Sequence, residues 1–170
     1  MLVVPDKFSP EKRSEIMSRI RGKDTAIEVK VRSYLFSMGL RFRKNDRRYP
    51  GTPDVVLPKY RTVIFINGCF WHGHENCKLF RMPKSNVDFW RNKILTNKAN
   101  DEKNQLLLEE MGFQVITIWE CELKSDFEQT MEETVRKIKS GDDSAIISQI
   151  AYIRVTREWE SSGTDFCNLE

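Results

Sequence analysis

Residues 53–67 read PDVVLPKYRTVIFIN. Two apolar runs rich in β-branched residues, at 54–57 and 62–66, are separated by a tight turn that begins with Pro58. This pattern predicts two hairpinned strands. Asp54 stands at the head of the first strand, and Asn67 follows the second. The other elements are predicted from the sequence on either side of this hairpin.

Two helices are predicted before the hairpin. Ser9-Pro10 is typical of an N-cap and a first helical position, and Gly22 is typical of a helix end. Residues 25–38 begin with the spacing of a capping box and continue with apolar residues at helical period. A short β-like run follows at residues 40–43.

The elements predicted after the hairpin are a helix at 85–111, a buried strand at 113–119, a capped helix at 125–139 and a weaker strand at 146–155. A break is predicted in the first of these helices near residues 97–101, which are mostly polar. The order of elements predicts an α/β fold in which a mixed central sheet is flanked by helices.

The composition is that of an ordinary globular domain. The chain has 170 residues, of which 39% are apolar and 31% charged, enough for one hydrophobic core. The apolar run at residues 1–4 is too short for a signal sequence, and no segment approaches the roughly 18 to 20 apolar residues of a membrane span. We therefore expect a cytoplasmic, nucleoid-associated protein with no membrane partner.

Positive charge is concentrated in the first third of the chain. Residues 7–49 contain 13 Lys or Arg against 5 Asp or Glu, a net charge of +8, whereas residues 140–170 carry a net charge of −4. A basic surface neutralises phosphates and releases counterions, so this distribution favours nucleic acid as the partner. The alternative is a set of solvated helix faces, which would mix the two signs more evenly.

Half of the four cysteines and both histidines lie in residues 67–77, NGCFWHGHENC. Thiolate and imidazole are preferred ligands of zinc, and this stretch contains the pattern C-x4-H-x2-C. The structural zinc site predicted from the spacing consists of Cys69, His74, Cys77 and, as the fourth ligand, Cys121. A closed site of this kind leaves His72 for acid–base chemistry.

The alternative for the cysteines is that all of them pack as small apolar side chains. A disulfide framework is not expected in a reducing compartment, so metal binding is the favoured interpretation. Cys167 is then left over as a free thiol.

The aspartate before the hairpin indicates a reaction type. Hairpinned strands with a carboxylate at the head of the first form the core of restriction-enzyme-type nucleases, where that carboxylate holds magnesium against the scissile phosphate. The usual Glu-x-Lys of the second strand is replaced by Phe65-Ile66-Asn67. Either the core is inactive, or its second-strand roles have moved to another residue, for which His72 is the obvious candidate.

The chain resembles the very short patch repair (Vsr) mismatch endonucleases over roughly residues 8–139. The motifs that carry the resemblance are, in order, DTAIE at 24–28, PG-x-PD at 50–54, VIF at 63–65, GCFWH at 68–72, DFW at 88–90 and WEC at 119–121. This family nicks DNA beside a thymine mispaired with guanine, the product of 5-methylcytosine deamination. The resemblance implies a restriction-endonuclease-like fold and double-stranded DNA with a mismatch as the partner.

The resemblance also implies catalytic roles. Asp54 would ligate magnesium together with the backbone carbonyl of Ile66, Glu28 would order metal-bound water, and His72 would be the general base. The alternatives are a turn aspartate at position 54 and an ordinary capping box for Glu28. Asn67 stands where the family is expected to hold a second histidine, and an amide hydrogen-bonds a phosphate oxygen but cannot transfer a proton.

Zinc in this family is structural and uses the positions already assigned from the spacing. The interval between His74 and Cys77 is one residue longer than in the family pattern, which affects the loop geometry. The sequence alone does not choose between His72 and His74 as the imidazole ligand.

DNA contacts are implied for aromatic and basic residues. Phe70, Trp71 and Trp90 match aromatics that insert into the duplex beside the mismatch, and Met17 and Ile20 match residues that press in from the minor groove. Core packing is the alternative for Trp90 and Met17. The basic residues assigned to DNA binding are Arg13, Arg19, Arg21 and Lys23.

The predicted organisation is a basic DNA-binding arm at 1–23, an endonuclease core at 24–139 and an extension of unassigned role at 140–170. The predicted activity is magnesium-dependent nicking of one strand next to a T:G mismatch by a protein that acts as a monomer. The alternatives are a related nuclease of restriction or defence with another DNA target, and a catalytically silent DNA-binding module that zinc stabilises.

Overall fold

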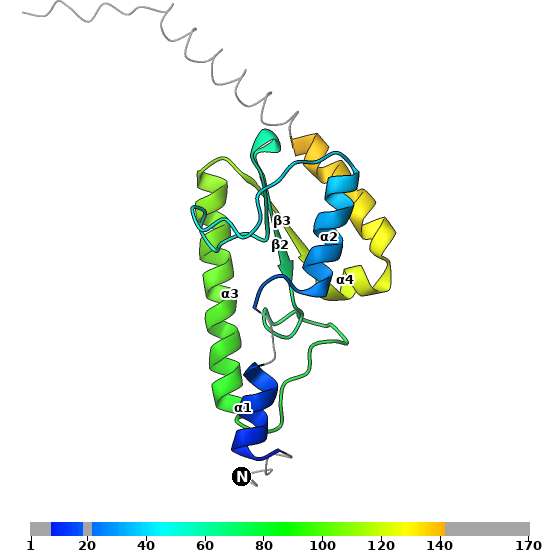
Figure 1. Cartoon of the computed structure of the whole chain (residues 1–170). Coiled ribbons are helices and arrows are strands. Elements are labelled where there is room, and N and C mark those ends of the chain that lie inside the picture. The colour runs from blue at the N-terminus through cyan, green and yellow to red at the C-terminus, as the bar shows by residue number, and fades with distance from the viewer. Residues whose placement is uncertain (1–7, 19–21, 142–170) are drawn as a thin grey trace, which may run out of the picture.

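The computed structural model describes residues 8–18 and 22–141 (Figure 1). Three strands, β1 (Val55–Leu57), β2 (Thr62–Asn67) and β3 (Gln114–Trp119), form one sheet in the order β1-β2-β3. β1 pairs antiparallel with β2, and β2 pairs parallel with β3. The mixed sheet predicted from the sequence is confirmed, and so is the hairpin at its edge.

Helices lie on both sides of this sheet. The labelled helices are α1 (Pro10–Ser18), α2 (Ala26–Ser37), α3 (Val87–Glu110) and α4 (Glu120–Ser125), and a further helix runs over residues 127–141. Figure 1 shows α3 along one side of the strands, and α2, α4 and the last helix on the other. Within the described part of the chain, no helix is long and apolar enough to cross a membrane.

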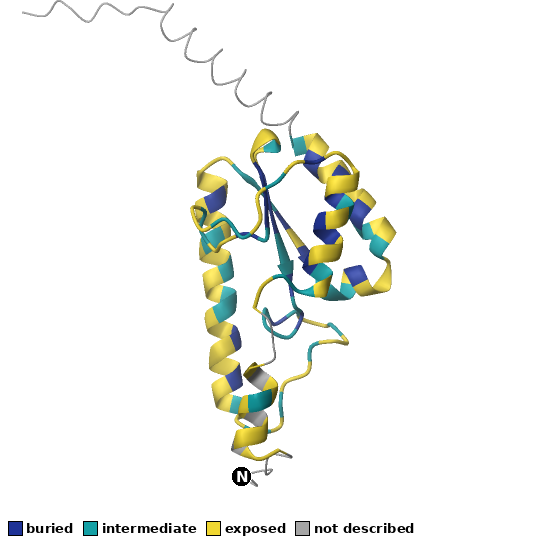
Figure 2. Ribbon diagram, viewed as in Figure 1, coloured by how far each residue is buried: buried dark blue, intermediate teal, exposed yellow. Residues whose placement is uncertain are grey.

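Each face of the sheet packs against its own hydrophobic cluster. The larger cluster includes Leu35, Ile64 and Met131, which are fully buried between the sheet and the side that carries α2 and the last helix. The smaller cluster contains Val63 and Leu108 and lies on the α3 side. Figure 2 shows the buried residues along the strands and on the inward faces of the helices. These two clusters hold the strand ends in place.

Two local predictions are confirmed in detail. Thr25 is the N-cap of α2, and its side chain accepts a hydrogen bond from the backbone N–H of Glu28. The turn between β1 and β2 is a 3-10 turn, Pro58–Tyr60, after which Arg61 adopts a left-handed conformation with φ of 43°. Both features depend on residues close in sequence, which is why the sequence predicts them.

Several predicted boundaries were wrong. Residues 40–43 form no strand, because the pairing there is a single bridge between Arg43 and Val56. Helix α3 has no break near residues 97–101, since the small helix penalty of polar residues is overcome by tertiary packing. The helix predicted at 125–139 begins at residue 127. Its cap is Asp126, whose Oδ1 accepts a hydrogen bond from the backbone N–H of Gln129 at 3.0 Å, so Ser125 is not the cap.

The strand predicted at 113–119, observed as β3, is buried at only some of its positions. β3 alternates between buried and accessible positions, and Thr117 is exposed because it faces a cavity rather than a helix. Helix α4, which follows it directly, was not predicted. The predicted strand at 146–155 and the free Cys167 lie outside the described residues.

Candidate functional site

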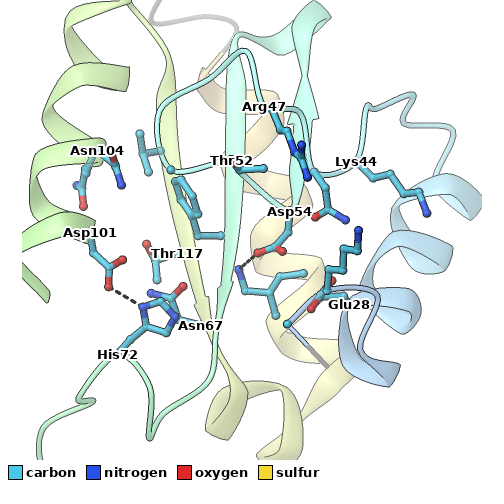
Figure 3. Close-up of a pocket in the computed structure, with 18 of the residues that line it drawn as sticks. Glu28, Lys44, Arg47, Thr52, Asp54, Asn67, His72, Asp101, Asn104 and Thr117 are labelled. Carbon is cyan, nitrogen blue, oxygen red and sulfur yellow. Dashed lines mark hydrogen bonds and ion pairs between the residues drawn. The ribbon is translucent and has the colours of Figure 1, made fainter. Parts of the chain in front are cut away.

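A cavity of about 600 Å³ opens between the sheet, the start of α2 and the face of α3. Figure 3 shows that it gathers side chains from distant parts of the chain, with Asp101 and Asn104 on α3 across from Asp54 and Glu28. The charged or titratable residues that line it are Lys23, Asp24, Glu28, Lys44, Arg47, Asp54, His72 and Asp101. Ile66 and Asn67 line it from the end of β2. An acidic interior with cations around it suits a substrate that is itself anionic and is bound through a metal ion.

Asp54 occupies the position just before β1. Its Oδ2 accepts a hydrogen bond from the backbone N–H of Ile66 at 2.8 Å. The pKa of Asp54 is raised to about 6, mainly by burial and in part by the nearby Glu28, whereas the Ile66 N–H, Arg32 and His72 act to lower it. Among the described residues no partner is recorded for Oδ1. A half-buried carboxylate with one oxygen free of protein partners fits a divalent cation.

Glu28 is tied to the start of α2. Its Oε1 accepts from the Thr25 hydroxyl at 2.8 Å, and its Oε2 accepts from the backbone N–H of Asp24 at 2.9 Å. The backbone N–H of Glu28 also donates to the Thr25 hydroxyl oxygen at 3.4 Å, which is the N-cap bond, so the capping alternative describes part of what Glu28 does in the fold. The residue also lines the cavity, where it lies near enough to Asp54 to affect that residue's pKa.

A buried guanidinium compensates the negative charge here. Arg32, which is 7% exposed, donates to Glu28 at 3.2 Å and to Asp24 at 2.6 Å. Its positive charge also favours the ionised form of Asp54, although burial outweighs that effect on the pKa. Sequence reasoning did not single out Arg32, because one arginine on a helix carries no signal until its partners are known.

His72 is held by a carboxylate from another element. Its Nδ1 lies 2.6 Å from Oδ2 of Asp101 on α3. An ionised carboxylate only accepts hydrogen bonds, so Nδ1 is the donor in this contact, and in the neutral ring Nε2 is the proton acceptor. Sequence reasoning missed Asp101, which lies 29 residues away along the chain and belongs to no local motif. The pair has the geometry of a general base and its orienting group.

Gly73 separates the two histidines by a turn that only glycine fits. Its φ is +60°, and a Cβ atom there would lie 2.6 Å from Cγ2 of Ile94. The backbone N–H of His74 donates to the carbonyl of Cys69 at 3.0 Å and closes the turn. As a result His72 faces the cavity, and His74 joins a second group of side chains.

That second group consists of Cys69, His74, Cys77 and Cys121, whose ligand atoms all lie within 4.8 Å of one another. Nδ1 of His74 is 3.6 Å from Sγ of Cys69 and 3.3 Å from Sγ of Cys121. A tetrahedral ion with metal–sulfur bonds of about 2.3 Å and a metal–nitrogen bond of about 2.0 Å would place such atoms about 3.6 Å apart. The cluster could therefore bind a metal ion.

The parallel pairing of β2 and β3 explains how a distant cysteine reaches this cluster. Asn67 and Trp119 are register partners at the ends of the two strands. Cys69 and Cys121 each follow two residues later, so the register brings them to the same end of the sheet. The His74 ring also stacks on the Trp119 ring, with centroids 4.0 Å apart and planes 8° from parallel.

The aromatic residues predicted to contact DNA pack against one another. Phe70 lies 5.2 Å from both Trp71 and Trp90, measured between ring centroids, and Trp71 lies 5.9 Å from Trp90. Trp90 is 9% exposed, which agrees with its core alternative, whereas its neighbour Phe89 is 62% exposed and was not singled out by the sequence. Phe70 and Trp71 remain partly exposed.

The N-terminal predictions are described only in part. Lys23 lines the cavity. Arg19, Ile20 and Arg21 lie outside the described residues, and so do the side chains of Arg13 and Met17 within α1.

The chain is similar to several known proteins. A family model described as DNA mismatch endonuclease Vsr matches residues 5–79. The type II nicking enzyme V.NmeAIP of Neisseria meningitidis is 52% identical over 136 residues, which cover 79% of this chain and 96% of that protein.

Two further relatives align over most of their lengths. The type II nicking enzyme V.XorIIP of Xanthomonas oryzae is 46% identical, with coverage of 69% of this chain and 86% of that protein. The DNA mismatch endonuclease Vsr of Escherichia coli is 41% identical over 127 residues, which cover 75% of this chain and 81% of that protein. The chain belongs to the Vsr family of DNA mismatch endonucleases.

Proposed function

We propose that this protein nicks one strand of duplex DNA next to a T:G mismatch by magnesium-dependent hydrolysis of a phosphodiester. The observation that carries the proposal is one cavity that contains a half-buried carboxylate whose Oδ1 has no partner among the described residues, a histidine oriented by Asp101, and cations along its border. Family membership supports DNA as the substrate. We also infer a restriction-endonuclease-like arrangement of the sheet and a monomeric active form.

Asp54 and the backbone carbonyl of Ile66 would hold the magnesium ion. The ion, when bound, supplies positive charge that polarises the scissile phosphate and stabilises the charge of the transition state. Glu28, already fixed by Thr25 and Asp24, presents its carboxylate toward the same space and would order water there.

His72 would take the proton from the attacking water at Nε2, while Asp101 holds Nδ1 and stabilises the imidazolium that forms. Asn67 lines the cavity beside these groups and is 8% exposed. Its amide can donate a hydrogen bond to a phosphate oxygen, but it cannot protonate the leaving oxygen. We therefore assign Asn67 to substrate orientation.

Zinc is the proposed ion of the Cys/His cluster. Three thiols and one imidazole form a donor set that zinc prefers, and four protein ligands close the coordination sphere. Burial raises the pKa of the Cys69 thiol to about 12, so this thiol becomes a thiolate only when a cation replaces its proton. The role of the ion is structural, because it joins the loop after β2 to the start of α4.

Mismatch recognition is assigned to Phe70 and Trp71, with Trp90 as the buried support beneath them. Separating stacked bases costs a few kcal/mol and costs least at a mispair, so inserted rings favour damaged sites. We expect Trp71→Ala to weaken binding to a T:G duplex by about 1 to 3 kcal/mol, the contribution of one stacked aromatic. Binding to paired DNA should weaken less, as measured by fluorescence anisotropy.

The control for Trp71 is Phe36→Ala, which removes an exposed aromatic of α2 that does not line the cavity. This variant should leave both affinities unchanged. If Trp71→Ala weakens binding to paired and mispaired DNA equally, the ring either contacts DNA without regard to the mismatch or stabilises the fold. Its proposed role in mismatch recognition would then be wrong. Thermal unfolding of each variant separates these two cases.

A second candidate function is nicking at another DNA target, as a companion of a restriction system. It is favoured by the names of two relatives, both of which are called type II nicking enzymes. The third candidate, a catalytically silent DNA-binding module, rests on Asn67.

One assay separates these three candidates. The protein is incubated with magnesium and end-labelled duplexes that carry T:G, each other mismatch or no mismatch, and the products are resolved on denaturing gels. We expect a single nick in the thymine strand of the T:G duplex. Nicking of fully paired DNA would favour the second candidate, and no nicking of any duplex would favour the silent module.

A further inference from the structure

The loop that leads from the bridge at Arg43 to β1 has a fixed shape. Asp46 accepts two hydrogen bonds from the Arg48 side chain, at 2.9 and 2.5 Å, and one from the Arg48 backbone N–H at 3.2 Å. Arg48 lowers the pKa of Asp46 to about 2, so this pair stays ionised across the neutral range. Tyr49 N donates to the Asp46 carbonyl at 3.2 Å and closes a turn.

Packing against the α3 side fixes the same loop from outside. The Tyr49 ring meets the Phe113 ring edge to face, with centroids 5.1 Å apart. Gly51 has a φ of +71°, and a Cβ atom there would lie 3.0 Å from the Asn104 side chain, so backbone and α3 are in close contact. These contacts therefore hold the loop backbone in place on both sides of position 47.

Arg47 occupies that position. It is exposed and lines the cavity, and Figure 3 shows it on the same side as Asp54 and Lys44. Within residues 8–18 and 22–141, no hydrogen bond or ion pair is recorded for its guanidinium. By contrast, Lys44 lies 3.3 Å from both carboxylate oxygens of Asp24, so its charge is already partnered.

An exposed guanidinium without a protein partner is free to bind an anion. The guanidinium fork matches two oxygens of a phosphate, and a loop backbone that is already fixed loses little entropy on binding. Arg47 and Asp54 line the same cavity, so a strand bound at Asp54 would lie close to this border. A nucleotide backbone supplies a phosphate at every step, so the phosphate next to the scissile one is the available ligand.

We propose that Arg47 is a phosphate-binding residue of this protein, which binds the DNA backbone at the border of the cavity, outside the position above Asp54. The assignment rests on the proposed function for the identity of the polyanion. Arg47 contributes affinity and register for the strand, and it takes no part in proton transfer.

The test compares Arg47→Ala and Arg47→Lys with the control Arg41→Ala. Arg41 belongs to the same basic segment, but its guanidinium lies 4.3 Å from the Phe36 ring and it does not line the cavity. Both alanine variants remove one positive charge, so they change the long-range attraction to DNA equally. Only Arg47→Ala removes the contact proposed here.

Binding is measured by anisotropy on a labelled duplex with one T:G mismatch, with magnesium omitted and salt varied. Arg47→Ala should raise Kd about 5- to 20-fold and reduce the slope of log K against log salt by about 1. Arg47→Lys should keep the wild-type salt slope, because it keeps the positive charge. Its affinity should lie between those of Arg47→Ala and wild type, because an ammonium lacks the paired donors of the guanidinium. Arg41→Ala should change Kd less than twofold.

Equal losses for Arg47→Ala and Arg41→Ala would overturn the proposal, since both would then act only through net charge. A lower kcat for Arg47→Ala at saturating duplex with an unchanged Kd would also overturn it, because Arg47 would then touch the scissile phosphate. These outcomes are separate from failure of the proposed function, which appears as wild-type protein that binds the duplex but does not nick it. Thermal unfolding checks that the variants remain folded.

Discussion

Replacing His72 by alanine should lower the nicking rate by about 10² to 10⁴-fold, the contribution of a positioned general base. Asp54→Asn should abolish nicking to at least the same extent, because the amide no longer holds magnesium. Both variants should retain their zinc and bind mismatched DNA nearly as tightly as wild type. Single-turnover nicking, zinc content and DNA affinity are measured on the same preparations.

The stability of Asp54→Asn gives an independent readout. The folded-state pKa of Asp54, about 6, lies above its ordinary value of 3.8, so the folded state binds this proton more tightly than the unfolded state. The stability that this group contributes is therefore present below pH 4 and is lost as pH rises through 6. Above that range the partly buried charge destabilises the metal-free fold by about 1 to 3 kcal/mol, at 1.36 kcal/mol per pKa unit.

Asp54→Asn should accordingly unfold at a higher temperature than wild type at pH 7 to 8 without divalent ions, and the difference should vanish near pH 4. Thermal unfolding followed by circular dichroism measures it. An inactive Asp54→Asn that is less stable than wild type at every pH would mean that Asp54 is a structural residue rather than a strained metal ligand.

Replacing His74 or Cys121 by alanine should remove the bound metal and destabilise the fold. The wild-type protein should contain one zinc ion per chain, and each variant should contain close to none. The free energy of unfolding should fall by several kcal/mol, less than the roughly 10 to 16 kcal/mol that zinc supplies to domains unable to fold without it, because two hydrophobic clusters remain. Metal analysis and thermal unfolding provide the two measurements.

Cys167→Ser serves as the control for the metal site, since Cys167 is the cysteine not assigned to the cluster. It should keep full zinc content. A wild-type protein without zinc when purified without chelators, or zinc unchanged after Cys121→Ala, would refute the ligand set. If His72→Ala loses zinc while His74→Ala keeps it and is inactive, the two histidines have exchanged roles.

Local patterns predicted the parts of the fold that depend on neighbouring residues. The Thr25 N-cap of α2 formed as expected, because its hydrogen bond, from the Glu28 N–H to Thr25 Oγ1, joins residues three apart. The hairpin of β1 and β2 followed from two apolar runs and a short turn. The break predicted in α3 was wrong because it was based on local sequence alone, whereas contacts with distant parts of the chain hold the polar residues at 97–101 in the helix. Asn97, for example, donates to the carbonyl of Trp71 at 2.8 Å.

The sequence by itself predicted the residues proposed for the two sites: a carboxylate before a strand, and cysteines and histidines spaced for a metal ion. Only the tertiary structure decided how these residues meet. The register of β2 against β3 brings Cys121 to Cys69, and the turn at Gly73 sends His72 toward the cavity and His74 toward the cysteines. The long helix α3 then places Asp101 beside His72. Spacing along the chain limits what can meet locally, whereas contacts between distant segments exist only once the sheet and the helices have packed.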